Sequence, residues 1–302
     1  MRHTLCAICD TDQWDRPLYP EALGNSAFTS DRFSARRLPD RVHYRMVQCA
    51  RCGLVRSDPV LDEEKLSRLY ADSRLTYQHE AGFAGETYAH YLREILPMVP
   101  GKNRLLEIGC GSGFFLERAL DFGFAEVSGI EPSRDAVEAA SPKVRGSIRN
   151  DIFNAGVFPD GSFDIVCGFQ VFDHLANPNE TLQACRRLLR PGGVILLIHH
   201  DVGAWTNRLL GERSPVIDVE HIYLYDRHTM ARLLAKNGFE MIRVFGVRNR
   251  YPIYYWTSLA PLPSGLKRSL VPKLRASRPG RATIAWNAGN LGIVGCFKPV
   301  KT

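Results

Sequence analysis

The chain has 302 residues, of which 45% are hydrophobic and 24% are charged, and its formal net charge is +7. These proportions are those of an ordinary globular protein, and the length suits one large domain with a small appendage. No apolar run approaches the ~18 residues that a membrane-spanning helix needs, and residues 1–6 contain no apolar signal core. We therefore expect a cytoplasmic protein without a membrane span.

Two pairs of cysteines near the amino terminus have the spacing of metal-binding knuckles. Each pair is a C-x-x-C sequence, the first formed by Cys6 and Cys9 and the second by Cys49 and Cys52. Each pair places two thiolates on one metal, and two pairs complete a tetrahedral site. A redox pair or an iron–sulfur cluster would use the same residues, but four thiolates suit zinc first. With no open ligand position, the pattern predicts a structural zinc ribbon over residues 1–60.

The rest of the chain predicts one α/β unit preceded by a helical segment. Residues 61–100 carry apolar side chains at helical spacing. Strands and helices then alternate from residue 104 to about 247, which predicts a parallel sheet with helices on both faces. Residues 250–281 are rich in Pro, Ser and Tyr and have no clear period. The later expected elements are a helix over 227–237 and strands over 240–247 and 291–297.

A glycine loop follows the first of these strands. Gly109, Gly111 and Gly113 stand at alternate positions just after Glu107. Glycine lets the backbone turn sharply and approach a ligand closely, and the next helix presents free N–H groups and a positive dipole end. Dinucleotide enzymes use G-x-G-x-x-G instead, but here Phe114 stands where the third glycine would be. The loop therefore predicts a cofactor site other than that for a dinucleotide.

An acidic residue ends the second strand of the unit. The apolar run 127–130 is followed by Glu131, which lies 18 residues after Gly113. In nucleotide-binding folds, an acidic residue near this position hydrogen-bonds the ribose hydroxyls. A carboxylate accepts several such bonds with good geometry. We therefore expect Glu131 to bind a ribose.

Together with four later segments, the loop and Glu131 resemble class I S-adenosylmethionine-dependent methyltransferases. The later segments are residues 150–152, 159–166, 168–174 and 189–197, and the resemblance covers about residues 101–250. It implies a Rossmann-like seven-stranded sheet with helices on both faces, in a methyltransferase domain over 101–302. It also implies that S-adenosylmethionine contacts Glu107, Gly109, Gly111, Gly113, Glu131, Asp151, Ile152 and Phe169, with Asp151 and Ile152 at the adenine.

The amino-terminal part resembles a narrower group. The cysteine pairs and the segment 49–55 are similar to the zinc-ribbon part of sugar C-methyltransferases and their shorter relatives. In that group the ribbon helps to form the substrate side of the cleft. This sequence ends about where their further carboxy-terminal domain would begin. We therefore leave the acceptor open among sugars, natural products and other metabolites.

Histidines follow the expected fourth and fifth strands, where open α/β sheets bind ligands. His174 follows the fourth strand, His199 and His200 the fifth, and Glu220 and His221 lie in the connection after it. The Glu-His pair resembles the motif of the sugar C-methyltransferases, where the histidine is implicated as the base. We predict His221, Glu220 and His199 as catalytic residues. Because side chains alternate along a strand, only one of His199 and His200 faces the cleft.

Three other interpretations are weaker. A nucleic-acid methyltransferase would carry an Asn/Asp-Pro-Pro-aromatic motif where residues 168–171 stand, or a Pro-Cys nucleophile, and the sequence has neither. A binding module with a decayed fold does not fit the intact glycine loop. A catalytic metal on His199, His200, Asp201 and His221 matches no known ligand spacing. We therefore expect a small-molecule acceptor and no nucleic-acid partner, with the methylated atom and the oligomeric state open.

Overall fold

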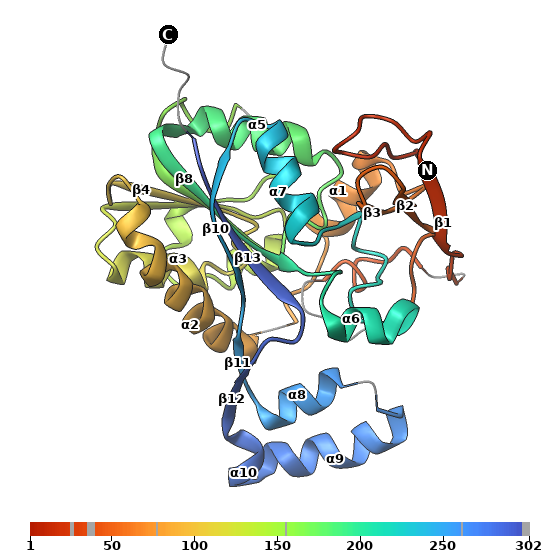
Figure 1. Cartoon of the computed structure of the whole chain (residues 1–302). Helices are drawn as coiled ribbons and strands as arrows, with labels where there is room; N and C mark the ends of the chain where they lie inside the picture. Colours follow the sequence, from red (N-terminus) through yellow and green to blue (C-terminus); the bar gives the residue numbers. More distant parts are fainter. Residues whose placement is uncertain (25–26, 35–39, 77, 155, 261, 298–302) are drawn as a thin grey trace.

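The core of the protein is a seven-stranded sheet (Figure 1). The computed structural model describes residues 1–24, 27–34, 40–76, 78–154, 156–260 and 262–297, and for 78–80 the backbone alone. Neighbouring strands are parallel, except that β13 runs antiparallel to both β10 and β8. In sheet order the strands are β10 (Glu240–Gly246), β13 (Asn290–Cys296), β8 (Leu189–His200), β7 (Phe163–Phe169), β4 (Arg104–Ile108), β5 (Glu126–Ile130) and β6 (Ile148–Arg149).

Helices cover both faces of this sheet, as the sequence predicted. On one face, α5 (Pro178–Leu188) and α7 (Arg227–Lys236) pack against alternate strand residues such as Leu106. On the other face, α2 (Gln78–Ile95) and α3 (Phe114–Asp121) pack against the residues between them, such as Leu105. All seven residues of β7 are buried, as expected for a central strand with helices above and below it.

The amino-terminal module forms a smaller sheet that is not confined to the first 60 residues. Strands β1 (Asp15–Tyr19), β2 (Met46–Cys49) and β3 (Val55–Ser57) form an antiparallel sheet whose fourth strand is β9 (Tyr223–Leu224). Ser57 makes two hydrogen bonds that join this sheet to the segment before β9. Its N–H donates to the Ile222 carbonyl at 2.8 Å, and its hydroxyl donates to the His221 carbonyl at 2.7 Å. The module therefore holds the segment that carries His221.

The connector and the loops contain shorter helices. Asp62 caps α1 (Glu63–Ala71) by accepting the Lys65 N–H at 3.1 Å. No helix in the described part of the chain is both long and apolar enough to cross a membrane. The remaining short helices are η1 (Leu96–Met98), α4 (Arg134–Glu138), η2 (Arg145–Ser147), α6 (Trp205–Leu210) and η3 (Gly211–Arg213).

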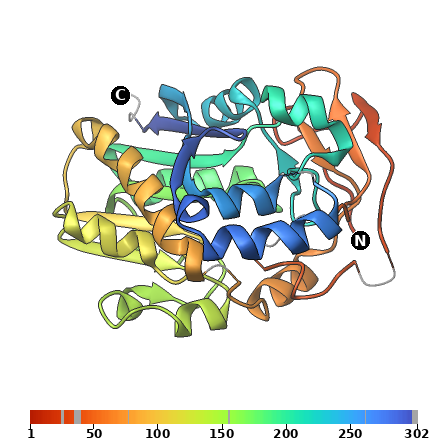
Figure 2. The ribbon, with the colours of Figure 1, turned by 90° about the horizontal axis from the view of Figure 1, so that it is seen from below.

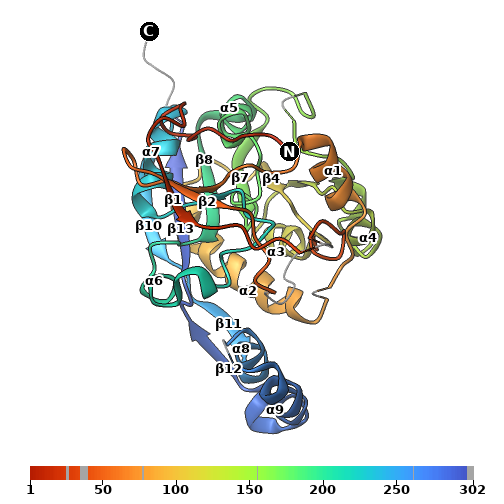
Figure 3. The ribbon, with the colours of Figure 1, turned by 90° about the vertical axis from the view of Figure 1, so that its right-hand side faces the viewer.

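A helical extension projects from the end of the sheet, in a region where the sequence showed no period (Figure 3). The strands β11 (Asn249–Pro252) and β12 (Thr283–Trp286) pair with each other and carry α8 (Ile253–Leu259), α9 (Ser264–Ala276) and α10 (Arg278–Arg281). Seen from below, α8 and α9 run from the α2 side toward the amino-terminal module (Figure 2). No residue of α8 or α9 is fully buried, so neither helix needs a clear apolar stripe.

Candidate functional site

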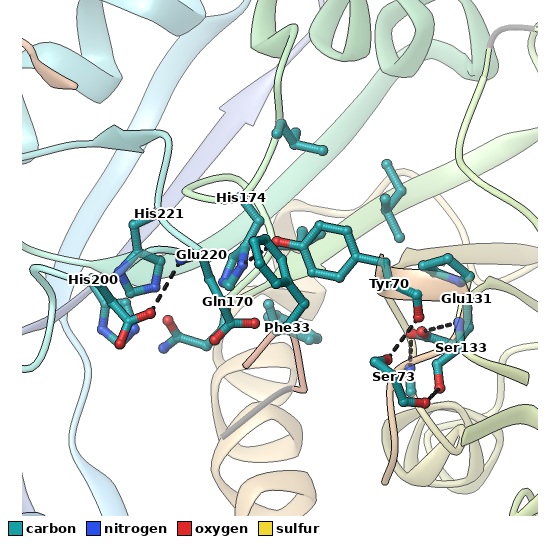
Figure 4. A pocket seen from close by; sticks show the side chains of 18 of the residues that line it. Phe33, Tyr70, Ser73, Glu131, Ser133, Gln170, His174, His200, Glu220 and His221 are labelled. Atoms are coloured by element: carbon teal, nitrogen blue, oxygen red, sulfur yellow. Dashed lines mark hydrogen bonds between the residues drawn. The ribbon is translucent and has the colours of Figure 1, made fainter. Parts of the chain in front are cut away.

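A cavity of about 980 Å³ opens at the carboxyl ends of β4, β5, β7 and β8. This is the edge at which open α/β sheets bind ligands, and the volume is at the upper end for small-molecule sites. One end is lined by the glycine loop and Glu131, and the other by His174, His200 and His221 (Figure 4). The cavity therefore has room for a cofactor and an acceptor side by side.

The glycine loop has the backbone conformation that its sequence requires. Gly109, Gly111 and Gly113 have φ angles of 68°, 55° and 72°, in the left-handed region that favours glycine. A Cβ on Gly113 would lie 2.9 Å from side-chain atoms of both Val144 and Ile148. Gly109 and Gly111 line the cavity, whereas Gly113 packs against those side chains at the start of α3. The third glycine therefore serves the turn rather than the cavity wall.

Glu131 ties this loop to the end of β5. Its Oε2 accepts the Gly111 N–H at 2.8 Å, and its Oε1 accepts the Ser133 N–H at 2.9 Å. Burial raises the pKa of Glu131, and these two hydrogen bonds oppose that rise. A carboxylate has about four acceptor positions, so both oxygens keep lone pairs for a ligand. The side chain also lines the cavity, which fits the predicted ribose contact.

The structure brings most of the other predicted cofactor residues to the same wall. Glu107, Ile152 and Phe169 line the cavity, and the Phe169 ring stacks on Tyr88 with centroids 4.3 Å apart. Asp151 does not line it. Its Oδ1 accepts the Ile152 N–H at 2.7 Å, so the adenine contact of Asp151 stays a prediction.

The opposite end of the cavity holds Glu220, His221, His174 and His200 (Figure 4). Val216 fixes the His221 ring, because its carbonyl lies 2.8 Å from Nδ1 and accepts a hydrogen bond from that atom. The other ring nitrogen, Nε2, lies 3.8 Å from Asp173 Oδ2. This end of the cavity therefore presents an oriented imidazole with one ring nitrogen directed away from the backbone.

Asp173 is the residue around which the histidines gather, and sequence reasoning did not single it out. It is fully buried, and Nε2 of His174, His200 and His221 lies 3.8, 3.9 and 3.8 Å from its carboxylate oxygens. Burial raises the pKa of Asp173, but the histidines outweigh burial and hold it well below its usual value. Burial, together with the neighbouring His221 and His199, lowers the pKa of His200 to about 4.

The structure does not place His199, which the sequence proposed as a catalytic residue, at the cavity. His199 is fully buried and does not line the cavity, whereas its neighbour His200 does. Side chains alternate along β8, and this register turns His199 toward Tyr225, with ring centroids 5.6 Å apart. Its Nδ1 lies 2.7 Å from the His200 carbonyl. Of the two histidines, His200 is therefore the one that faces the cavity.

Two further parts of the cavity wall were not predicted. The carboxy-terminal extension contributes Tyr251, Tyr255, Trp256 and Trp286, with the Trp256 and Trp286 ring centroids 5.5 Å apart. Gln170, the first residue after β7, has a positive φ of 56°, which is uncommon for a residue other than glycine. Its Nε2 donates to Asn290 Oδ1 at 2.9 Å. Neither feature could be recognised from the sequence without knowing the fold.

The four amino-terminal cysteines lie together. Their sulfur atoms all fall within 4.8 Å of one another, with Cys6 and Cys52 at 3.3 Å and Cys9 and Cys49 at 4.0 Å. Four thiolates around a zinc ion with Zn–S bonds of about 2.3 Å would be separated by roughly 3.8 Å. The spacing thus fits a tetrahedral zinc ion.

A family model described as a methyltransferase domain matches residues 77–244, which is more than half of the chain. The chain belongs to this methyltransferase family. The match confirms the resemblance to class I S-adenosylmethionine-dependent methyltransferases, and the matched region contains the glycine loop, Glu131 and the histidine cluster.

Curated relatives align with parts of this methyltransferase. The ubiquinone biosynthesis O-methyltransferase of Caulobacter vibrioides is 32% identical over 102 residues, which cover 31% of this chain and 39% of that protein. Its counterpart from Shewanella halifaxensis is 28% identical over 130 residues, which cover 40% and 54%. The matches thus span about half or less of these relatives. Geranyl diphosphate C-methyltransferase from Streptomyces coelicolor A3(2) aligns with a TM-score of 0.48 at 13% identity, over 70% of this chain and 77% of that one.

Proposed function

We propose that this protein transfers a methyl group from S-adenosylmethionine to a small-molecule acceptor. The observation that carries the proposal is one cavity with the glycine loop and Glu131 at one end and Glu220 and His221 at the other. The cofactor supplies an activated methyl group and a good leaving group. The protein then has to align the acceptor atom with that methyl group and remove the acceptor's proton.

His221 is the residue we propose for the proton transfer. Its Nδ1 is engaged with the Val216 carbonyl, so Nε2 is the nitrogen that accepts a proton. The imidazolium that forms would lie 3.8 Å from the buried Asp173 carboxylate, which stabilises positive charge. Glu220 lines the same end of the cavity and supports acceptor binding there. His199 has no part in this proposal, because it lies outside the cavity.

The acceptor we propose has an apolar or aromatic portion. The extension places Tyr255, Trp256 and Trp286 along the cavity wall, and aromatic side chains bind flat apolar groups by stacking. The curated relatives named for ubiquinone biosynthesis point to the same broad class of acceptor. Nucleic acid remains the alternative acceptor, with the basic residues of α9 and α10 as its contact.

We propose a structural role for the ribbon. A zinc ion on Cys6, Cys9, Cys49 and Cys52 would fix the first 60 residues as a module next to the connector over 61–100 and the catalytic unit over 101–302. The ribbon would affect the reaction through Ser57, because the two hydrogen bonds of Ser57 hold the backbone of His221 and Ile222.

The test is a methyl-transfer assay on the full chain with S-adenosylmethionine. The acceptors are a panel of hydroxylated aromatic compounds, sugar nucleotides and structured RNA, and mass spectrometry detects an added methyl group. We expect a methylated small molecule whose formation is lost in His221→Ala, while the variant still binds S-adenosylmethionine. Methylation of RNA alone would favour the alternative, and absence of any S-adenosylmethionine binding by the wild type would refute the proposal.

A further inference from the structure

We propose that Asp173, His200 and His221 form a binding site for a divalent transition-metal ion at the acceptor end of the cavity. The three side chains come from distant parts of the chain: the loop after β7, the end of β8 and the segment before β9. This inference rests on the proposed methyl transfer, and it gives His221 the role of a metal ligand in place of that of the base.

The spacing of the three ligand atoms is the first argument. Asp173 Oδ2 lies 3.9 Å from His200 Nε2 and 3.8 Å from His221 Nε2, and no two ligand atoms are more than 4.8 Å apart. These separations are too long for hydrogen bonds. A point equidistant from the three atoms lies about 2.1–2.5 Å from each, which is close to the length of metal–nitrogen and metal–oxygen bonds.

The surroundings of Asp173 are the second argument. Both carboxylate oxygens are buried, and neither accepts a hydrogen bond from any residue that the structure describes. A buried carboxylate is costly unless a cation or hydrogen-bond donors compensate it. Three imidazole nitrogens face it at 3.8–3.9 Å, and imidazole is itself a metal ligand. A shared metal ion would satisfy the carboxylate and the histidines at once.

The outer contacts of the histidines are the third argument. His221 is held through Nδ1 by the Val216 carbonyl at 2.8 Å. Metal-binding histidines usually donate the second ring N–H to such a partner, which fixes the tautomer and the ring orientation. The Asp173 carbonyl also accepts the Ile222 N–H at 2.7 Å, which fixes the two backbones relative to each other. The His221 ring and the Asp173 backbone are thus fixed before any ion binds.

Two histidines and one carboxylate leave open coordination positions, and the exposed side of His200 and His221 is the cavity. This site suits an acceptor with a hydroxyl group, because the hydroxyl oxygen could bind the ion at an open coordination position. A hydroxyl bound to such an ion would be more acidic. Glu220, which lines the same end of the cavity, would take its proton, the oxygen would take the methyl group, and S-adenosylhomocysteine would leave. His221 Nε2 is then a metal ligand, and the ion replaces it in activating the acceptor.

The experiment counts Zn²⁺ per chain. The full-length wild type, Asp173→Asn and His200→Gln are saturated with Zn²⁺, passed through a desalting column and analysed for metal, and calorimetry follows the Zn²⁺ titration. We expect the wild type to hold one Zn²⁺ more than either variant, and calorimetry to show binding at least about 100-fold weaker at the altered site. The matched control is Asp201→Asn, since Asp201 is a carboxylate one residue after His200 but outside the cluster.

Equal zinc content in the wild type and both variants would overturn the metal site, as would an equal loss in Asp201→Asn. Thermal melting and S-adenosylmethionine affinity are measured on each variant. They show that the fold is intact, and that a failure of the metal site is separate from a failure of cofactor binding. If Asp173→Asn does not fold, His200→Gln decides the result, because the His200 side chain is 29% exposed.

Discussion

Replacing Glu131 by alanine tests the cofactor site most directly. In the protein this carboxylate accepts two backbone N–H groups, from Gly111 at 2.8 Å and from Ser133 at 2.9 Å. Hydrogen bonds to a charged group contribute about 1.5–3 kcal/mol each to stability or binding. If Glu131 also binds the ribose, Glu131→Ala should weaken S-adenosylmethionine binding by about 1.5–3 kcal/mol, which is roughly a 10- to 150-fold rise in Kd.

Comparing two ligands distinguishes loss of the ribose contact from damage to the glycine loop. Calorimetry would compare S-adenosylhomocysteine with its 2′,3′-dideoxyribose analogue on the wild type, Glu131→Ala and the control Glu126→Ala. Glu126 is exposed at the opposite end of β5 and pairs with Arg104. The wild type and the control should both prefer the intact ribose, and Glu131→Ala should lose that preference. An unchanged preference in Glu131→Ala would refute the ribose contact, even if the affinity for both ligands falls.

Three other changes test the remaining parts of the site. His221→Ala should reduce turnover by roughly 10²–10⁴-fold with little change in S-adenosylmethionine affinity, in steady-state kinetics and calorimetry; near-normal turnover would remove His221 from the reaction. Cys49→Ser should release the ribbon zinc and lower the melting temperature, because metal binding energy is folding energy; elemental analysis finding the same zinc content would contradict this. Trp256→Ala should raise the acceptor KM about 2- to 12-fold through lost stacking of about 0.5–1.5 kcal/mol, and a change in kcat alone would argue against an acceptor contact.

The loss of turnover in His221→Ala does not by itself distinguish a base from a metal ligand. Either role requires Nε2 of His221 at the acceptor end of the cavity. The zinc count on Asp173→Asn separates the two, because a directly acting base needs no additional ion. Comparing the two variants therefore shows whether Asp173 stabilises a protonated histidine or binds a metal ion with it.

The parts of the fold that the sequence predicted are those with strong local constraints. The strand that ends at Ile108 is apolar because helices cover both of its faces, and the loop after it needs glycines because its φ angles are positive. The helix α7, expected over 227–237, occupies Arg227–Lys236 with its capping box at Asp226. In each case the pattern lies within a few neighbouring residues, so it can be recognised in the sequence before the tertiary contacts are known.

The features that sequence reasoning missed depend on contacts between distant segments. Asp173 belongs to the candidate site because it lies next to His200 and His221, which are 27 and 48 residues further along the chain. The choice between His199 and His200 depends on the register of β8, which its neighbours in the sheet set, and a shift of one residue reverses it. In the extension, α8 and α9 bury no residue completely, so no apolar stripe marked them in the sequence.

The contacts around His221 explain why a distant zinc ribbon would matter to the reaction. The carbonyl of His221 accepts the Ser57 hydroxyl, its ring is held by the Val216 carbonyl, and the next residue pairs with both Ser57 and Asp173. Ser57 ends β3, and β3 pairs with β2, which carries Cys49. Loosening the cysteine site should therefore disturb His221 through a continuous set of hydrogen bonds, which reaches His221 through the Ser57 hydroxyl. The glycine loop and Glu131 lie outside this set, so Cys49→Ser should lower turnover before it weakens cofactor binding.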